Sequence, residues 1–248
     1  MENRIKDIKL IVIDIDGTLI DSEGQIGEKT LHLAKELKKH DIYCTLSSAR
    51  SFHYSAHLAD ELEIDIPFVT LDGALIKDRK GNTVFRGLIK DTLVKKAIKL
   101  AEENYGKITM CDENNLYVTP RNAVVKEYTK LNAPVMEVPD FSDVSDILEI
   151  LIFCEDKVSL KFIRQNFGFI DRLGISLSVT KSPRNDYYLL TIKNSGSNKF
   201  ESVKRLVNHL GLNRKNVAVI GDWHNDMPLF EYGGYNIAVQ NAIPELKR

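Results

Sequence analysis

Mostly apolar runs alternate with amphipathic stretches over the first third of the chain. The runs at 10–14, 42–46 and 67–71 are short and bounded by polar residues, which predicts three strands. Apolar positions three or four apart over 28–40 predict a helix, and Ser51 is a candidate cap for a second helix over 51–62. Strands that alternate with helices predict an α/β fold built on a doubly wound parallel sheet.

The pattern changes between residues 81 and 192. The Gly81-Asn82 pair lies between two apolar stretches and predicts a hairpin. The section that follows is α+β in character, which predicts a separate inserted module. Its expected helices are 91–104 and 159–166, and its expected strands are 116–119, 147–153, 177–180 and 187–192.

The α/β pattern returns near residue 193. We therefore expect one core domain from residues 1–80 and 193–248, interrupted by an inserted α+β domain over 81–192. The expected core elements here are helices at 199–210 and 225–232 and strands at 217–221 and 235–239.

Composition excludes several classes of protein. The 248 residues are 43% hydrophobic, which is enough for a core plus an inserted module. Lysine and arginine number 34 and aspartate and glutamate 35, so the basic excess of a nucleic-acid binder is missing. The sequence shows neither a signal peptide nor an apolar run of about 18 residues. We expect a cytoplasmic protein with no membrane or nucleic-acid partner, a monomer or a weak homo-oligomer.

The three cysteines, Cys44, Cys111 and Cys154, are far apart. They form no CxxC pair and no metal-ligand spacing with histidine. Sparse, odd-numbered cysteines indicate a reducing compartment, where they serve as small apolar side chains.

Two carboxylates, Asp14 and Asp16, follow the first predicted strand and precede Gly17. Ligand sites in open α/β sheets lie at the carboxyl ends of the strands, so this pair is expected in a functional crevice. Close carboxylates repel each other unless a cation or a shared proton compensates. The pattern suits Mg²⁺ and phosphoryl chemistry, although Asp-Gly after a strand also forms ordinary turns.

Two further groups could contact an anion. Ser48 follows the second predicted strand beside a helix start, where a hydroxyl and the helix dipole favour an anion. Simple capping by Ser48 or Ser51 is the alternative. Lys199 opens a predicted helix against the helix dipole, which makes sense if it faces an anion.

The last group follows the apolar strand at 217–221. Asp222, Asn225 and Asp226 bring two carboxylates and an amide to one strand end. Oxygen ligands spaced around a turn suit a hard divalent cation. A capped turn is the alternative interpretation.

These groups in this order resemble the haloacid dehalogenase-like phosphatase superfamily. The insertion resembles the cap of its subfamily IIB, the Cof-type phosphatases. The resemblance implies a Rossmann-like core and an inserted cap that selects the substrate. Its motifs stand here at 14–18, Ser48, Lys199 and 221–226, with further similarity at 71–74 and 239–242.

The resemblance also implies roles for the catalytic and metal-binding residues. Asp14 would attack phosphorus and form an aspartyl-phosphate, and Asp16 would act as general acid and then as general base. Mg²⁺ would be held by Asp14, the Asp16 backbone carbonyl and Asp222, with Asp226 in support.

Phosphate binding is implied for four residues. Ser48, Lys199 and backbone N–H groups near Gly17 would hold the phosphoryl oxygens. Asn225 would lie beside the phosphate or the metal ligands.

The chain departs from the family pattern at three places. Ser48-Ala49-Arg50 replaces Thr-Gly-Arg, and a Ser-Ser pair also occurs in the mannosyl-3-phosphoglycerate phosphatase branch. Asp72 stands where asparagine is common; its carboxylate would repel a phosphate, so no substrate role is carried onto it. Family members continue past residues 241–242 with a helix and a final strand, so a chain ending at Arg248 is either naturally short or truncated.

The expected function is a magnesium-dependent phosphatase that acts on small phosphorylated metabolites, above all sugar phosphates. A phosphomannomutase-like phosphomutase and a non-catalytic phosphometabolite-binding protein are the alternatives. Polar residues in the predicted loops of the insertion could contact the substrate, although exposed loops are commonly polar: Arg121, Asn122, Arg184 and Asn185.

Overall fold

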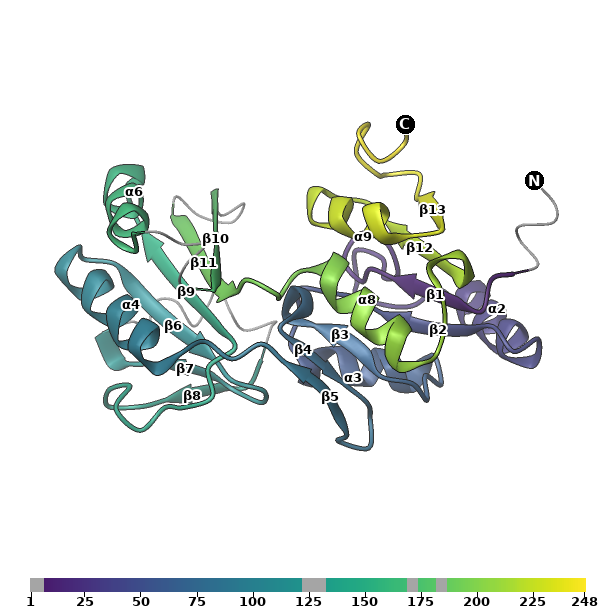
Figure 1. Cartoon of the computed structure of the whole chain (residues 1–248), viewed down its shortest axis with the longest axis horizontal. Helices are drawn as coiled ribbons and strands as arrows, with labels where there is room; N and C mark the ends of the chain where they lie inside the picture. The colour runs from purple at the N-terminus through teal and green to yellow at the C-terminus, as the bar shows by residue number, and fades with distance from the viewer. Residues whose placement is uncertain (1–6, 122–132, 169–173, 182–186) are drawn as a thin grey trace. The chain divides into compact units, whose positions relative to one another are not determined.

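The computed structural model describes residues 7–121, 133–168, 174–181 and 187–248. The chain divides into two compact units (Figure 1). Unit 1 comprises residues 1–49, 54–85 and 198–248, and unit 2 comprises residues 50–53 and 86–197. No helix within the described ranges is long and apolar enough to cross a membrane.

A four-stranded parallel sheet forms the centre of unit 1 (Figure 1). Strand β1 (Leu10–Ile13) pairs with β12 (Val217–Gly221) on one side and with β2 (Tyr43–Leu46) on the other. Strand β13 (Tyr235–Ala238) pairs with the outer side of β12. The central strands are almost wholly apolar because parallel strands are covered on both faces.

The strand order contains a reversal that locates a ligand site. From β1 the chain moves outward to β2, and a bridge between Ser47 and Val69 places β3 (Phe68–Thr70) next in line. The chain later returns to the opposite side of β1 as β12. The carboxyl ends of β1 and β12 therefore border the crevice in which open α/β sheets bind ligands.

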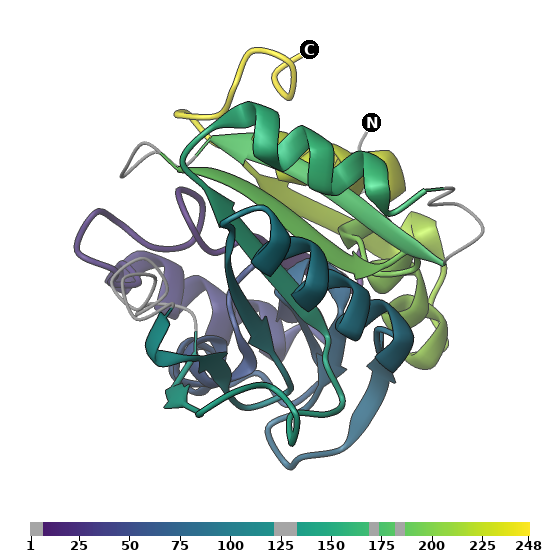
Figure 2. The ribbon, with the colours of Figure 1, turned by 90° about the vertical axis from the view of Figure 1, so that its left-hand side faces the viewer.

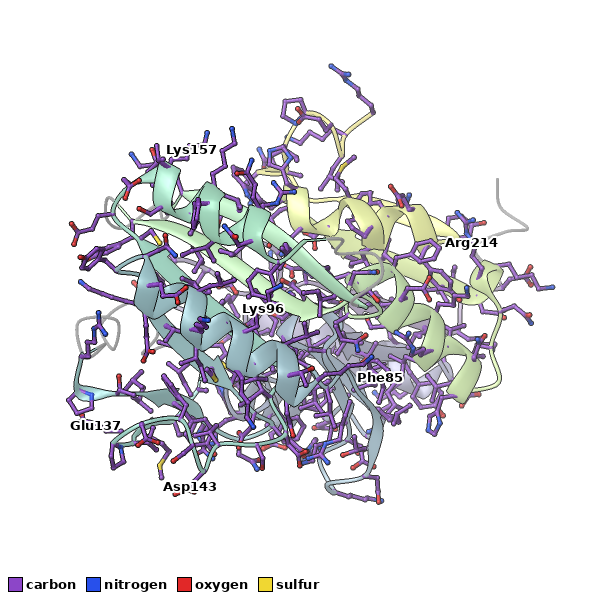
Figure 3. All side chains as sticks on the ribbon, turned by 60° about the vertical axis from the view of Figure 1, so that its left-hand side comes forward. Phe85, Lys96, Glu137, Asp143, Lys157 and Arg214 are labelled. Atoms are coloured by element: carbon purple, nitrogen blue, oxygen red, sulfur yellow. The ribbon has the colours of Figure 1, made fainter. Side chains whose placement is uncertain are left out.

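Apolar side chains of helix α8 (Lys199–His209) pack against this sheet. Val203, Leu206 and Val207 are fully buried with Leu10, Val12, Val217 and Val219 in one cluster. The Arg205 guanidinium lies over the ring of Phe85, labelled in Figure 3, at 4.1 Å from its centroid. The remaining elements with a bearing on unit 1 are α2 (Glu28–Lys39), α3 (Phe52–Glu61), α8 (Lys199–His209), α9 (Met227–Tyr232), β4 (Leu75–Lys77), β5 (Thr83–Arg86) and the 3-10 turns η1 (Leu71–Gly73), η3 (Arg214–Asn216) and η4 (His224–Asp226).

Unit 2 is an α+β module. Its six-stranded sheet has the order β10-β11-β9-β6-β7-β8 and is antiparallel except for the β7–β8 pair. Helices α4 (Asp91–Glu103) and α6 (Lys157–Asn166) lie along one face of this sheet (Figure 2). Lys96 of α4, labelled in Figure 3, donates to the Phe167 carbonyl at 3.2 Å. The strands are β6 (Lys107–Cys111), β7 (Leu116–Val118), β8 (Val135–Glu137), β9 (Glu149–Cys154), β10 (Ile175–Lys181) and β11 (Tyr188–Asn194).

The predicted α/β architecture with an inserted α+β module is confirmed, with differences in detail. Strands β6 and β8 were not expected: polar and apolar residues alternate over 107–110, a signal that went unused, and Val135–Glu137 is short and largely exposed. Leu71 was expected at the end of a strand but begins η1 with a positive φ of 50°.

Candidate active site

Three strand ends of the parallel sheet place polar residues next to one another. Asp14 follows β1, and its N–H donates to the Ile220 carbonyl of β12 at 3.0 Å. On the other side, the Ser47 N–H donates to the Ile13 carbonyl at 2.9 Å. The sheet hydrogen bonds thus continue to the point where Asp14 leaves the strand, so the apolar runs themselves hold this carboxylate in place.

A glycine is required beside Asp222. Gly17 has a φ of 79°, and a Cβ atom there would lie 2.4 Å from Asp222 Oδ2. The Thr18 hydroxyl donates to Asp222 Oδ1 at 2.9 Å. The Asp-Gly-Thr sequence therefore lets the loop after β1 close tightly against the carboxylate that follows β12.

Lys199 is the first residue of α8, and its side chain is 1% exposed. Its Nζ donates to Asp14 Oδ1 at 2.5 Å and to Asp226 Oδ1 at 2.6 Å. Asn198 caps the helix by accepting the Glu201 N–H at 2.9 Å. This cap fixes the start of α8 at Lys199, so the Lys199 ammonium reaches the carboxylates at the strand ends.

Both oxygens of Asp226 are occupied by protein donors. Oδ1 accepts from Lys199, and Oδ2 accepts the N–H groups of Asp222 at 2.9 Å and Trp223 at 3.2 Å. Asp226 is completely buried. This carboxylate therefore fixes both the backbone around Asp222 and the ammonium of Lys199.

Burial raises the pKa of Asp14 from its ordinary value of 3.8 to about 7. The ammonium of Lys199 opposes the shift, whereas the negative charges of Asp226 and Asp222 increase it. Burial also raises the pKa of Asp222, although the hydrogen bond from Thr18 opposes it. An added positive charge near Asp14 and Asp222 would therefore stabilise the ionised forms of both carboxylates.

Burial by itself lowers the pKa of Lys199, but the surrounding carboxylates raise it overall. The negative charges of Asp14, Asp72 and Asp226 all contribute to this increase. Lys199 is therefore held as an ammonium ion within this cluster.

The donor set fits a hard divalent cation. Asp14, Asp222 and Asp226 each offer one carboxylate oxygen, and these atoms lie within 4.8 Å of one another. All three residues are buried, and carboxylate oxygens are the ligands that Mg²⁺ and Ca²⁺ prefer. We call these three residues and Lys199 the Asp14 cluster. It holds three carboxylates and one ammonium, so a divalent cation would balance its charge.

Comparison with known proteins decides the family. The family model of the haloacid dehalogenase-like hydrolases matches residues 11–248. The chain belongs to this family.

Two curated relatives and one solved structure illustrate the likeness. The hydrolase is 24% identical over 245 residues to 5-amino-6-(5-phospho-D-ribitylamino)uracil phosphatase YitU of Bacillus subtilis, covering 96% of this chain and 89% of YitU. It is 27% identical over 251 residues to stress response protein YhaX of the same organism, covering 97% and 85%. A haloacid dehalogenase-like hydrolase from Bacteroides thetaiotaomicron shares the fold, with a TM-score of 0.82, 24% identity and coverage of 97% and 91%.

The other predicted core residues of this hydrolase lie around the Asp14 cluster. Ser48 is 1% exposed, and its N–H donates to the Val69 carbonyl at 3.1 Å. Asp16 and Asn225 are exposed, Asn225 within η4. The Gly17 carbonyl accepts the side-chain amide of Asn241 at 2.8 Å. The structure thus gathers these residues in unit 1, some buried and some open to solvent.

Sequence reasoning missed two residues of the hydrolase. Asn241 was noted only as part of a similar segment, and its bond to Gly17 joins positions far apart in the chain. Asp72 was given no role, yet its negative charge helps to raise the pKa of Lys199. Two signals were available: its place after a predicted strand, which other strand-end aspartates share, and its departure from the asparagine that is common in the family.

The candidate substrate residues of the insertion are only partly described. Arg121 lines a cavity of about 640 Å³ within unit 2, together with residues of α4 and the segment 139–145. Asn122, Arg184 and Asn185 lie outside the described residues.

Proposed function

We propose that this hydrolase is a magnesium-dependent phosphatase that cleaves small phosphorylated metabolites, above all sugar phosphates, through an aspartyl-phosphate intermediate. The observation that carries the proposal is the position of Asp14. It is buried at the end of β1, bonded to Lys199, and has a carboxylate oxygen within 4.8 Å of oxygens from Asp222 and Asp226. The name of YitU describes a phosphatase for a phosphate carried on a ribityl chain, which supports this substrate class.

In the first step, a carboxylate oxygen of Asp14 attacks phosphorus, and the bond from phosphorus to the leaving alcohol breaks. Asp16 donates a proton to the leaving oxygen. Its exposed position two residues after Asp14 suits a group that exchanges protons with the substrate and with water. In the second step, Asp16 takes a proton from water, which hydrolyses the aspartyl-phosphate and restores Asp14.

Positive charge and hydrogen-bond donors stabilise the transferring group. Lys199 neutralises charge beside Asp14, and the Ser48 hydroxyl and the Gly17 N–H donate to phosphoryl oxygens. Asn225 donates its side-chain amide beside them.

Mg²⁺ supplies further neutralisation when bound. We assign its ligands as Asp14, the backbone carbonyl of Asp16, and Asp222. Asp226 acts in support, because both of its oxygens already accept bonds from protein donors. The inserted domain, expected at residues 81–192, selects the substrate.

A panel of phosphate esters tests the proposal. Purified protein is incubated with para-nitrophenyl phosphate and with hexose and pentose phosphates, with either Mg²⁺ or EDTA, and inorganic phosphate is measured. We expect release that requires Mg²⁺ and is fastest with sugar phosphates. Absence of phosphate release from every ester in the presence of Mg²⁺ would contradict the proposal. Interconversion of hexose phosphates without phosphate release would instead identify a phosphomutase.

A further inference from the structure

The turn after β3 has an unusual backbone. Leu71, Asp72 and Gly73 have φ values of 50°, 48° and 102°, so three consecutive residues lie in the left-handed region. Glycine and aspartate tolerate this region, whereas leucine does not favour it. Strain of this kind persists only where the surrounding structure requires it, and it is concentrated at functional sites.

Two contacts hold the turn against the proposed phosphate site. The Asp72 N–H donates to the Ser48 carbonyl at 2.8 Å. On the other side, a Cβ atom on Gly73 would lie 2.6 Å from the carbonyl oxygen of Asn198, the cap of α8. The turn is therefore fixed between Ser48 and the residue that precedes Lys199.

The side chain of Asp72 is half-buried, and its charge acts strongly on Lys199. We place the Ser48 hydroxyl at the phosphoryl oxygens and Lys199 beside Asp14, which attacks phosphorus. The carboxylate of Asp72 thus lies beside the phosphoryl site but differs from Asp14 and Asp222, because it is outside the group of oxygens that fits a metal ion.

A carboxylate in this position discriminates between substrates by the charge on their alcohol part. It can only accept hydrogen bonds when ionised, so hydroxyl or amine groups of a substrate stabilise it. A second anionic group on the substrate would be repelled. An asparagine at the same place would lack the charge while keeping a similar size and a similar tolerance of the left-handed region.

We propose that Asp72 is a specificity-determining residue that favours phosphate esters of neutral, hydroxylated alcohols and rejects esters whose alcohol part carries a carboxylate or a second phosphate. The proposal rests on the proposed phosphatase function and adds a rule for its substrates. Discrimination is achieved by a repulsive charge as well as by an attractive contact.

Competition between two matched esters tests this rule. Glycerol 3-phosphate and 3-phosphoglycerate differ at one carbon, which is a hydroxymethyl group in the first and a carboxylate in the second. Hydrolysis of para-nitrophenyl phosphate with Mg²⁺ serves as the reporter, and each ester is added as a competitor. The ratio of the two inhibition constants measures charge selection even if neither ester is turned over quickly.

We expect the wild-type protein to bind glycerol 3-phosphate at least about tenfold more tightly than 3-phosphoglycerate. Asp72→Asn should reduce this ratio about tenfold, mainly by tightening the binding of 3-phosphoglycerate. Asp65→Asn removes an exposed carboxylate that pairs with Lys38 and is the matched control, so it should keep the wild-type ratio.

Asp72→Gly separates charge from backbone strain. Glycine adopts the left-handed region freely, so this variant removes the carboxylate and relieves the strain together. If charge determines selection, Asp72→Asn and Asp72→Gly lower the ratio alike. If Asp72→Asn does not fold, as judged by thermal melting, Asp72→Gly provides the same measurement.

Three results overturn the inference. These are a wild-type ratio near one, an unchanged ratio in Asp72→Asn, and failure of both esters to compete at tens of millimolar while the reporter is hydrolysed. Failure of the wild-type protein to hydrolyse the reporter or any other ester overturns the proposed phosphatase function instead.

Discussion

The two units differ in where they bury charged side chains. In unit 2, α4, α6 and the sheet enclose an apolar cluster that includes Ile108, Ile150 and Leu190, all at most 2% exposed. Unit 1 has a comparable apolar cluster between its sheet and α8, but charged side chains follow its central strands. Burial of a charge costs free energy of desolvation. The concentration of buried charges at strand ends therefore indicates a functional site rather than a requirement of the core.

Two buried lysines make the contrast quantitative. Lys199 bonds two carboxylates at 2.5 and 2.6 Å and is 1% exposed. Lys193 of unit 2 lies 3.6 Å from Glu149, with side-chain exposures of 10% and 12%. The pair in unit 2 joins one positive and one negative charge, whereas in the Asp14 cluster carboxylates outnumber ammonium three to one. Charge balance alone therefore distinguishes a structural ion pair from a site that can accept a cation.

The largest expected effect follows removal of the nucleophile. Asp14→Asn should lower kcat for para-nitrophenyl phosphate by about 1000-fold or more, because a neutral amide cannot form the covalent intermediate. Phosphate release is measured with Mg²⁺, with Asp65→Asn as the control for loss of an exposed carboxylate. Activity above about a tenth of wild type in pure Asp14→Asn would refute the nucleophile assignment.

Removal of the Lys199 ammonium should destabilise the fold, because the carboxylates around it lose their positive partner. Lys199→Met leaves Asp14 and Asp226 buried without their shared partner, which should cost about 3–5 kcal/mol in the free energy of unfolding in urea. Lys193→Met in unit 2 should cost less, since its pair is wider and better solvated. Mg²⁺ should partly restore Lys199→Met. Equal losses in the two variants would contradict the contrast between the units.

The metal-free protein should lose stability as the pH rises. The pKa of Asp14 in the folded state is raised from 3.8 to about 7, so the fold binds a proton more tightly than the unfolded chain does. This contribution is present below about pH 4 and disappears as the pH passes through about 7. In EDTA, Asp14→Asn should therefore gain stability over wild type between pH 5 and pH 8. A difference that is independent of pH would show that Asp14 ionises normally.

The smallest effect is expected from a helix cap of unit 2. Asp156 caps α6 by accepting the Ser159 N–H at 2.7 Å. Asp156→Ala should cost about 1 kcal/mol in the free energy of unfolding. Phosphate release should stay at the wild-type level, because the carboxylate has a local structural role. A large loss of kcat without a loss of stability would give unit 2 a part in the chemistry.

The sequence predicted the sheet centre and its strand-end aspartates for one physical reason. Buried parallel strands require apolar runs, so Asp14 and Asp222 stand out directly after β1 and β12. Strand β8 was missed because it has only three residues, two of them exposed, and depends on its neighbour for its conformation. Strand β6 does alternate polar and apolar residues over 107–110, so its pattern could have been recognised.

Long-range packing explains what could not be predicted around the site. The closeness of Asp72 to Lys199 depends on a turn with positive φ values and on the approach of Gly73 to Asn198. The bond from Asn241 to Gly17 joins residues more than 200 positions apart. Local patterns in a sequence carry no information about such contacts.

Trapping of the phosphoenzyme tests the central claim most directly. Asp16→Asn should still be phosphorylated on Asp14 but should lose the base that activates water, so the intermediate should accumulate. The variant is mixed with para-nitrophenyl phosphate and Mg²⁺, quenched in acid and mapped by mass spectrometry. The account predicts one added phosphoryl group on Asp14, absent in EDTA and in Asp14→Asn/Asp16→Asn. A phosphoryl group on another residue, or steady turnover with none on Asp14, would contradict it.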